Sequence, residues 1–340
     1  MFSRDKSIVF NSDVSPQSRG NILWILSLFL TFTVVLGCAS CQKEEPSIEQ
    51  EITCSDGIKN GLEEGVDCGG NCPNCETEIQ VPGGGYVSAN AYPGYELVWS
   101  DEFEGSNLVT DNWSFHLGDG CPNLCGWGNN EQQTYTGAPE NIKVDQGYLF
   151  ITALEENLNG KNYSSSRIHT DGKFEFRYGR IDIRAAMPSA TGTWVALWLL
   201  NHEYQVQDPA KFWPSGGEID IMEYLGEEER KIFGTAHFGT DFPANHRFVS
   251  GYHTTQQHPF DKAFYVFSII WEKDRIQWLI NDEVYHEVTP STTAQFGQPY
   301  PFNDHFYLIM NLSVGGNLPV APIASEFPST LIIDYIRVFQ

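Results

Sequence analysis

The sequence predicts an all-β fold for residues 94–340, a β-sandwich of the jelly-roll type, preceded by a small cysteine-rich module. Three observations support this prediction. From Tyr95 onward, hydrophobic residues either alternate with polar ones or form short continuous runs, as they do in strands. Gly, Pro, Asn and Asp interrupt these runs at short intervals, which is typical of turns. Helical periodicity is not visible, so two packed sheets account best for this part of the chain.

Particular segments have strand character. Residues 147–153 and 264–271 are rich in β-branched and aromatic residues. Residues 275–280 and 284–288 are separated by Asn281-Asp282-Glu283 and predict a hairpin. Residues 173–178 and 180–184 alternate strictly and should bury one face while presenting the other.

Composition limits the partners of this protein. The 340 residues are 41% hydrophobic, enough for a sizeable core, and 44 acidic side chains against 20 basic ones give a formal charge of -24. This charge repels polyanions, so we expect no nucleic-acid partner and favour a neutral substrate. Aromatic residues form 14% of the chain, and their flat faces suit both core packing and sugar rings. We expect a monomer.

The amino terminus predicts export. Cationic residues precede an apolar run over 22–36, which is too short for a membrane span of about 20 residues, so residues 1–40 are interpreted as a signal peptide. The run leads into Leu36-Gly37-Cys38-Ala39-Ser40-Cys41, which resembles a bacterial lipobox. Acylation of Cys41 (or Cys38) would give a membrane-anchored lipoprotein. The following Gln42-Lys43-Glu44-Glu45 is similar to signals that direct lipoproteins to the outer surface of the outer membrane. An ordinary secretory signal is the alternative.

The remaining cysteines suggest disulfides. We expect a tether over 41–53, a disulfide-rich module over 54–76 and a flexible linker over 77–93, where Pro82-Gly83-Gly84-Gly85 lies. In an oxidising compartment a stretch this small and polar is interpreted as a two-disulfide knot, with a zinc site as the alternative. The module's cysteines are Cys54, Cys68, Cys72 and Cys75. Cys121 and Cys125 are close enough in sequence to form a loop-stapling disulfide.

Three acids share six residues in the segment Glu218-Ile219-Asp220-Ile221-Met222-Glu223. On a regular strand Glu218 and Asp220 share one face, and Glu223 would point with the isoleucines into the core. A buried, unpaired carboxylate is costly. We therefore expect Met222 to form a β-bulge that returns Glu223 to the side of the other two acids, since bulges often lie beside active sites.

Carboxylates on one open face are what glycosidic bond cleavage requires. Like charges crowded together separate their pKa values, so that one acid is ionised while another is protonated and donates a proton. Asp220 could hydrogen-bond Glu218 and tune its charge. The alternative is an acidic edge strand whose charges only face water.

The chain resembles glycoside hydrolase family 16, in the bulged form found in laminarinases and agarases. The similarity covers nearly all of residues 94–340 and implies a concanavalin A-like jelly roll with a concave substrate groove. Besides the acidic segment, the matching stretches, in chain order, are residues 97–103, 126–132, 163–168, 178–184, 192–198, 311–317 and 333–339.

The resemblance implies a retaining endo-glycoside hydrolase in which Glu218 attacks the anomeric carbon, Asp220 supports it, and Glu223 is the acid and base. It implies no cofactor for catalysis but a possible structural Ca²⁺ held by Glu102, the backbone of Gly147, and Asp334. The sugar contacts that it implies come from Asn130, Arg167, Trp194, Trp198, Trp213 and His237. For the tryptophans, core packing is the alternative, and for His237 the alternative is a structural histidine whose hydrogen bonds are satisfied within the protein.

The preferred substrate is expected to be β-1,3-glucan of the laminarin type or a mixed-linkage β-glucan. Departures from the usual family pattern concern the groove walls: Val195 replaces a proline, Leu318 replaces a tryptophan, and the segment 201–212 is lengthened. Hydrolysis of a marine galactan such as agarose is therefore an alternative. Two non-enzymatic alternatives are a β-glucan-binding protein, disfavoured because both glutamates are present, and a purely structural surface lipoprotein.

Overall fold

A computed structural model describes residues 54, 57, 59–62, 68, 70–72, 79–202 and 211–340. The chain divides into two compact units, Met1–Glu76 and Thr77–Gln340. The predicted signal peptide (1–40), the tether (41–53), both candidate lipidation cysteines and Cys75 lie outside the described residues. In the part of the chain that is described, no helix has the length and apolar character needed to cross a membrane.

In the first unit, a disulfide joins Cys54 to Cys72, and Cys68 is also disulfide-bonded. These three sulfurs are therefore not free thiolates. Since a zinc site of the kind considered needs thiolate ligands, the disulfide interpretation is confirmed for the described cysteines and the zinc alternative is wrong.

The second unit consists of two sheets, in which all strand pairs are antiparallel except β3 with β6. The first sheet has ten strands, in the spatial order β16 (Glu283–Val288), β15 (Arg275–Ile280), β14 (Tyr265–Glu272), β9 (Gly179–Ala186), β18 (Ser329–Phe339), β5 (Tyr148–Leu158), β6 (Lys161–Ser165) and β3 (Gln133–Tyr135), with β1 (Leu97–Asp101) on β18 and β4 (Ile142–Asp145) on β5.

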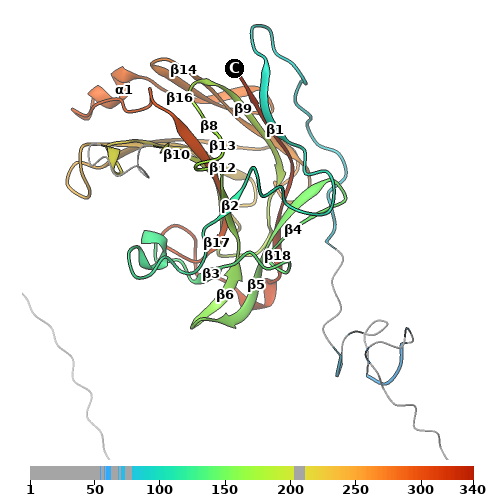
Figure 1. Ribbon diagram of the computed structural model, residues 1–340. Helices are drawn as coiled ribbons and strands as arrows, with labels where there is room; N and C mark the ends of the chain where they lie inside the picture. Colours follow the sequence, from blue (N-terminus) through green and yellow to red (C-terminus); the bar gives the residue numbers. More distant parts are fainter. Residues whose placement is uncertain are drawn as a thin grey trace, which may run out of the picture. The chain divides into compact units, whose positions relative to one another are not determined.

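The second sheet has eight strands, in the order β13 (Arg247–Thr254), β12 (Lys231–Phe238), β11 (Glu218–Leu225), β10 (Thr193–Asn201), β17 (Phe306–Val314), β7 (Arg167–His169) and β2 (Ser114–Phe115), with β8 (Glu175–Phe176) on β17. Among the described residues, the short helices include α1 (Pro290–Ala294) and the 3₁₀ turns η1 (Cys125–Gly128) and η4 (Ala324–Glu326). Figure 1 shows β10, β12 and β13 in one layer beside β14 and β16 of the other. The all-β sandwich is confirmed.

The core lies between the two sheets. Ile219 and Ile221 of β11 and Ile181 and Ile183 of β9 are buried in one hydrophobic cluster. Because strand side chains alternate, Ile219 and Ile221 in the core direct Glu218 and Asp220 to the opposite face of the second sheet. Burial of each large apolar side chain contributes about 1.5–3 kcal/mol. The core thus fixes which face of β11 bears its acids.

The predicted hairpin is confirmed as β15–β16. Its turn residues Asn281 and Asp282 have φ angles of 49° and 68°, which Asn and Asp tolerate better than most residues. The strand expected over 173–178 is shorter than predicted. Only Glu175–Phe176 pairs, because the backbone N–H groups of Lys173 and Phe174 both donate to the carbonyl of Thr170 and close a turn there.

We expected the polar face of β9 to be exposed to solvent, but it is buried. All eight residues of β9 are buried. Asp182 is completely buried and accepts hydrogen bonds from Arg180 (2.7 Å), Ser268 (2.6 Å) and Tyr92 (2.7 Å). A buried charge needs such partners, and here they come partly from the segment that precedes the predicted domain boundary at Gly94.

That segment was expected to be a flexible linker, and several of residues 79–93 contact the sheet. Arg184 of β9 donates to the backbone carbonyls of Tyr86 (2.6 Å) and Gly84 (2.8 Å), and Ile79 packs on the hydrophobic cluster around Phe264. The Gly-rich composition suggested flexibility, but main-chain carbonyls are satisfied here by an arginine that is distant in sequence. The segment covers the sheet.

Candidate active site

The acidic strand β11 carries the expected bulge. Between Asp220 and Glu223 the strand advances three residues while its partner β12 advances two, and the pairing with β10 shifts at the same place. Ile221 and Met222 are both buried, at 1% and 0% exposure, so two consecutive side chains point to the core. The extra residue returns Glu223 to the side of Glu218 and Asp220, as predicted. We call this side the carboxylate face.

Glu223 is held by two donors on that face. Trp194 Nε1 donates to its Oε1 at 3.2 Å, and Thr235 Oγ1 donates to its Oε2 at 3.1 Å. Burial raises the pKa of Glu223, while these hydrogen bonds and His237 act in the opposite direction. The carboxyl group is therefore fixed in orientation and favours holding a proton more than an exposed glutamate would.

Glu218 and Asp220 face His237 on the neighbouring strand β12. His237 Nε2 lies 3.2 Å from Asp220 Oδ2 and 3.9 Å from Glu218 Oε1. Burial, followed by the charge of Asp220, raises the pKa of Glu218 to about 8, and His237 opposes this increase. Burial also raises the pKa of Asp220, with Glu223 as the second cause. The imidazole of His237 thus lies within 4 Å of two acids that resist ionisation.

Arg167 and Trp198 lie together on the same sheet. The Arg167 guanidinium is 4.5 Å from the ring of Trp127 and 4.9 Å from that of Trp198, a cation-π arrangement on two sides. Trp198 Nε1 donates to Asn311 at 2.9 Å. Within the described part of the chain, Arg167 Nε is buried without a hydrogen-bond partner. Such a donor is available to an oxygen of a ligand.

The other two predicted tryptophans differ in their surroundings. Trp194 is 8% exposed and contacts Glu223 directly, so it is a supporting residue of the acid rather than an open platform. Trp213 is partly buried, and its ring lies 6.2 Å from that of His237 and 4.5 Å from that of His246. Both tryptophans therefore belong to the carboxylate site.

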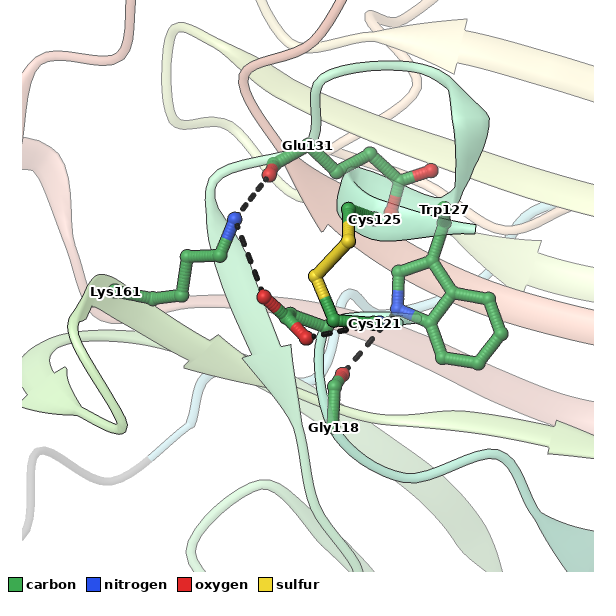
Figure 2. The surroundings of a disulfide bond; sticks show 7 residues. Gly118, Cys121, Cys125, Trp127, Glu131 and Lys161 are labelled. Carbon is green, nitrogen blue, oxygen red and sulfur yellow. Dashed lines mark hydrogen bonds and ion pairs between the residues drawn. A yellow bond between two sulfur atoms is a disulfide. The ribbon is translucent and has the colours of Figure 1, made fainter. Parts of the chain in front are cut away.

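Asn130 lies in a different environment. It is exposed and donates to Asn317 at 2.7 Å. It also lines an open pocket of about 370 Å³, together with Glu131 and Lys161. Figure 2 shows this region around the Cys121–Cys125 disulfide, which confirms the predicted staple. None of the residues lining the pocket is one of the three acids, so the structure does not place Asn130 in contact with them.

Four further residues on or next to the carboxylate face were not predicted to belong to the site. Thr235 could have been found from its period-two spacing to His237 on β12. Phe248 and Tyr252 pair with His237 and Phe233, so they share the carboxylate face and are 57% and 67% exposed. Exposed aromatic side chains suit sugar rings. His246 follows a loop with no periodic pattern, and nothing in the sequence indicated its contact with His237.

The two carboxylates predicted to hold calcium, those of Glu102 and Asp334, form hydrogen bonds with arginines. Both carboxylate oxygens of Glu102 accept hydrogen bonds of 2.8 Å from Arg337, and Asp334 accepts one from Arg184. Gly147 lies in a turn with φ of 79°. Guanidinium groups already neutralise both carboxylates, so this donor set does not fit a calcium cage as arranged. Calcium binding stays a prediction.

One group elsewhere has the residue types of a cation site. Asp171 Oδ1 and Glu175 Oε1 lie 3.1 and 3.3 Å from His202 Nδ1. Hydrogen bonding between the histidine and the two acids accounts for the same distances, and we assign no ion to this group.

Comparison with known proteins identifies the family. The model of the glycosyl hydrolases family 16 matches residues 129–335. Glucan endo-1,3-beta-glucosidase A1 of Niallia circulans is 37% identical over 74% of this chain, which spans only 38% of that relative's length. A beta-glucanase of Rhodothermus marinus is 38% identical, covering 73% of this chain and 86% of the relative.

The chain is also similar in sequence and fold to a solved structure. The laminarinase catalytic domain from Thermotoga maritima MSB8 is 38% identical, has a TM-score of 0.66, and covers 72% of this chain and 98% of its own. The chain therefore belongs to the glycosyl hydrolases family 16.

Proposed function

We propose that this protein is an endo-acting β-1,3-glucanase that cleaves laminarin-type glucan with retention of configuration. The observation that carries the proposal is the bulge in β11, which places Glu223 on the same face as Glu218 and Asp220. The names of the relatives, a glucan endo-1,3-beta-glucosidase and a laminarinase, support the choice of substrate. The neutral glucan also suits a chain with a formal charge of -24.

In the first step, ionised Glu218 attacks the anomeric carbon as the glycosidic bond breaks. Glu223 transfers its proton to the leaving oxygen, and a glycosyl ester on Glu218 results. In the second step Glu223 removes a proton from water, which attacks the same carbon and releases Glu218. Two inversions at one carbon give net retention.

The surroundings of the two glutamates support these roles in different ways. Burial raises the pKa of Glu223, which favours the protonated form needed first. Its hydrogen bonds from Trp194 and Thr235 stabilise the anion formed after proton transfer. Glu218 must be ionised, although burial raises its pKa to about 8. A positive charge on His237, 3.9 Å from Glu218, would favour the anion.

Substrate contacts are proposed for the rest of the carboxylate face. The buried, unpartnered Nε of Arg167 can donate to a sugar hydroxyl, and Trp198 beside it offers a ring face. Phe248 and Tyr252 extend the face beyond β12. Leu318, which stands where related chains have tryptophan, is 56% exposed and leaves that position apolar without an aromatic ring.

Activity against three polysaccharides tests the proposal. Laminarin, lichenan and agarose are incubated with the full-length protein, and reducing ends are measured. We expect release from laminarin, with the β-anomer appearing first by proton NMR. Activity on agarose with none on laminarin would identify a galactan hydrolase. Laminarin binding without reducing-end release would identify a glucan-binding protein instead.

We also propose that the protein is a lipoprotein anchored through Cys41 or Cys38 and facing the cell surface. The apolar run over 22–36 followed by small residues and cysteine supports this. Replacing both cysteines with alanine should abolish fatty-acid labelling and release the protein from membranes. Unchanged labelling would reject the anchor.

A further inference from the structure

His246 contacts the active-site histidine directly. It lies at the end of the loop that joins β12 to β13, and its Nε2 is 2.9 Å from Nδ1 of His237. The two ring planes differ by 9°. This is hydrogen-bond distance between two ring nitrogens, so one of them carries the proton and the other accepts it.

The surroundings of Nε2, the other ring nitrogen of His237, bear on which nitrogens of His237 carry protons. Nε2 lies 3.2 Å from Asp220 and 3.9 Å from Glu218, and ionised carboxylates only accept hydrogen bonds. Where Asp220 and Glu218 are ionised, their negative charges favour a proton on Nε2. If Nδ1 also carries one, His237 is an imidazolium cation, and that proton needs an acceptor. The only nitrogen that the described structure places next to Nδ1 is Nε2 of His246.

The surroundings of His246 favour its neutral form. Trp213, Phe242 and Phe248 surround it, with ring centroids at 4.5, 5.8 and 6.1 Å. Burial is the main cause that lowers the pKa of His246 to about 4, followed by the charges of His237 and Arg247. A neutral imidazole has one nitrogen with a free lone pair. His246 can thus accept the Nδ1 proton at neutral pH.

Other charged groups act on the same pair. On the carboxylate side these are Glu218, Asp220 and Glu223, and a positive charge on His237 lowers the pKa of Glu218 and of Glu223. Arg167 also favours ionisation of Glu218, and Arg247, which follows His246 in the sequence, lowers the pKa of His246. The acids and His246 therefore favour the same doubly protonated state of His237.

We propose that His246 is a positioning residue that accepts the Nδ1 proton of His237 and so keeps His237 as an imidazolium facing Asp220 and Glu218. The positive charge then favours the ionised form of Glu218 that attacks the sugar. This last step rests on the proposed glucanase function. The protonation of His237 does not, since it follows from contacts within the protein.

Two variants separate this role from packing. His246→Leu keeps an apolar side chain of similar reach but removes the acceptor. His246→Gln places an amide oxygen where Nε2 lies and restores an acceptor. Both are made in the full-length chain, and circular dichroism confirms folding. Nitrogen-15 NMR of the histidine rings, assigned with a His237→Gln variant, then shows which nitrogens of His237 carry protons.

Near neutral pH we expect two protonated nitrogens on His237 in the wild type and in His246→Gln, and only Nε2 protonated in His246→Leu. With laminarin, the acidic limb of the kcat/KM profile should move up by about 0.5–1 pH unit in His246→Leu and return in His246→Gln. A wild-type His237 with a single protonated nitrogen would overturn the proposal, as would a profile that His246→Leu leaves unchanged.

Laminarin hydrolysis and the NMR spectra test the two proposals independently. If the wild-type protein does not hydrolyse laminarin, the proposed function is wrong, but the NMR spectra need no substrate and still decide the protonation of His237. If laminarin is hydrolysed and the spectra of the Leu variant match those of the wild type, the glucanase assignment stands and His246 only packs against its neighbour.

Discussion

Trp194 Nε1 donates a 3.2 Å hydrogen bond to Glu223 Oε1. The two residues are brought together by the pairing of β10 with β11, in which the register shift next to Trp198 matches the bulge near Met222. A buried tryptophan thus orients the carboxyl group proposed to transfer the proton. Trp194, which was predicted to contact the sugar, instead donates a hydrogen bond that lowers the pKa of Glu223.

Trp194→Phe should raise the pKa of Glu223, because the hydrogen bond from Trp194 lowers it. The alkaline limb of the kcat/KM profile should move up by about 0.5–1 pH unit, and kcat should fall about tenfold because Glu223 becomes a weaker acid and transfers its proton less readily in the first step. Thr235→Val, which removes the other donor, is the matched variant and should act in the same direction. A downward shift in either variant would reject this role.

Glu218→Gln should change the pH dependence of stability. Burial raises the pKa of Glu218 from an ordinary value of 4.5 to about 8, so the folded state holds the proton more tightly than the unfolded chain does. The resulting contribution to stability is fully present below pH 4.5 and is lost as pH rises through about 8.

Glutamine has no such titration. We therefore expect the variant and the wild type to be equally stable near pH 4, and the variant to be more stable near pH 9 by on the order of 1–3 kcal/mol. Urea unfolding at a series of pH values measures the difference. A difference that does not change with pH would contradict the assigned environment of Glu218.

Arg167→Lys should weaken substrate binding. Lysine keeps the charge but loses the planar group that lies between Trp127 and Trp198, and it loses the buried Nε donor. We expect KM for laminarin to rise about 3- to 10-fold, which corresponds to roughly 1 kcal/mol, with a smaller change in kcat. Lys161→Arg, at the pocket edge, is a control. An unchanged KM in Arg167→Lys would place the sugar elsewhere.

Removing the Cys121–Cys125 disulfide should affect Trp127. The bond lies at the start of η1, and Trp127 Nε1 donates to the carbonyl of Gly118 at 3.2 Å across the stapled loop (Figure 2). Replacing both cysteines with serine should cost about 2 kcal/mol of unfolding free energy. KM should rise because Trp127 packs on Arg167. If stability falls while KM is unchanged, the loop does not contribute to substrate binding.

The sequence predicted features that depend on local alternation. Ile219 and Ile221 fix the inward face of β11, and an acid at 223 is tolerable only if the strand bulges, so the position of all three acids followed from the pattern. The hairpin β15–β16 followed from Asn281 and Asp282 in the same way.

Features that depend on contacts between distant residues were not predictable. Arg184 satisfies the backbone carbonyls of Gly84 and Tyr86, about a hundred positions earlier, and a carbonyl has no sequence signature. His246 reaches His237 because it lies two residues before Phe248, the cross-strand partner of His237 in the β12–β13 pairing. The pairing of Glu102 with Arg337 likewise depends on β1 lying beside β18.

Turnover of laminarin by the Glu218→Ala variant tests the central claim most directly. The variant should release no reducing ends, because the attacking carboxylate is absent, while retaining the wild-type circular dichroism spectrum and most of its affinity for laminarin. Full residual activity in a folded Glu218→Ala protein would contradict the assignment of this carboxylate as the nucleophile.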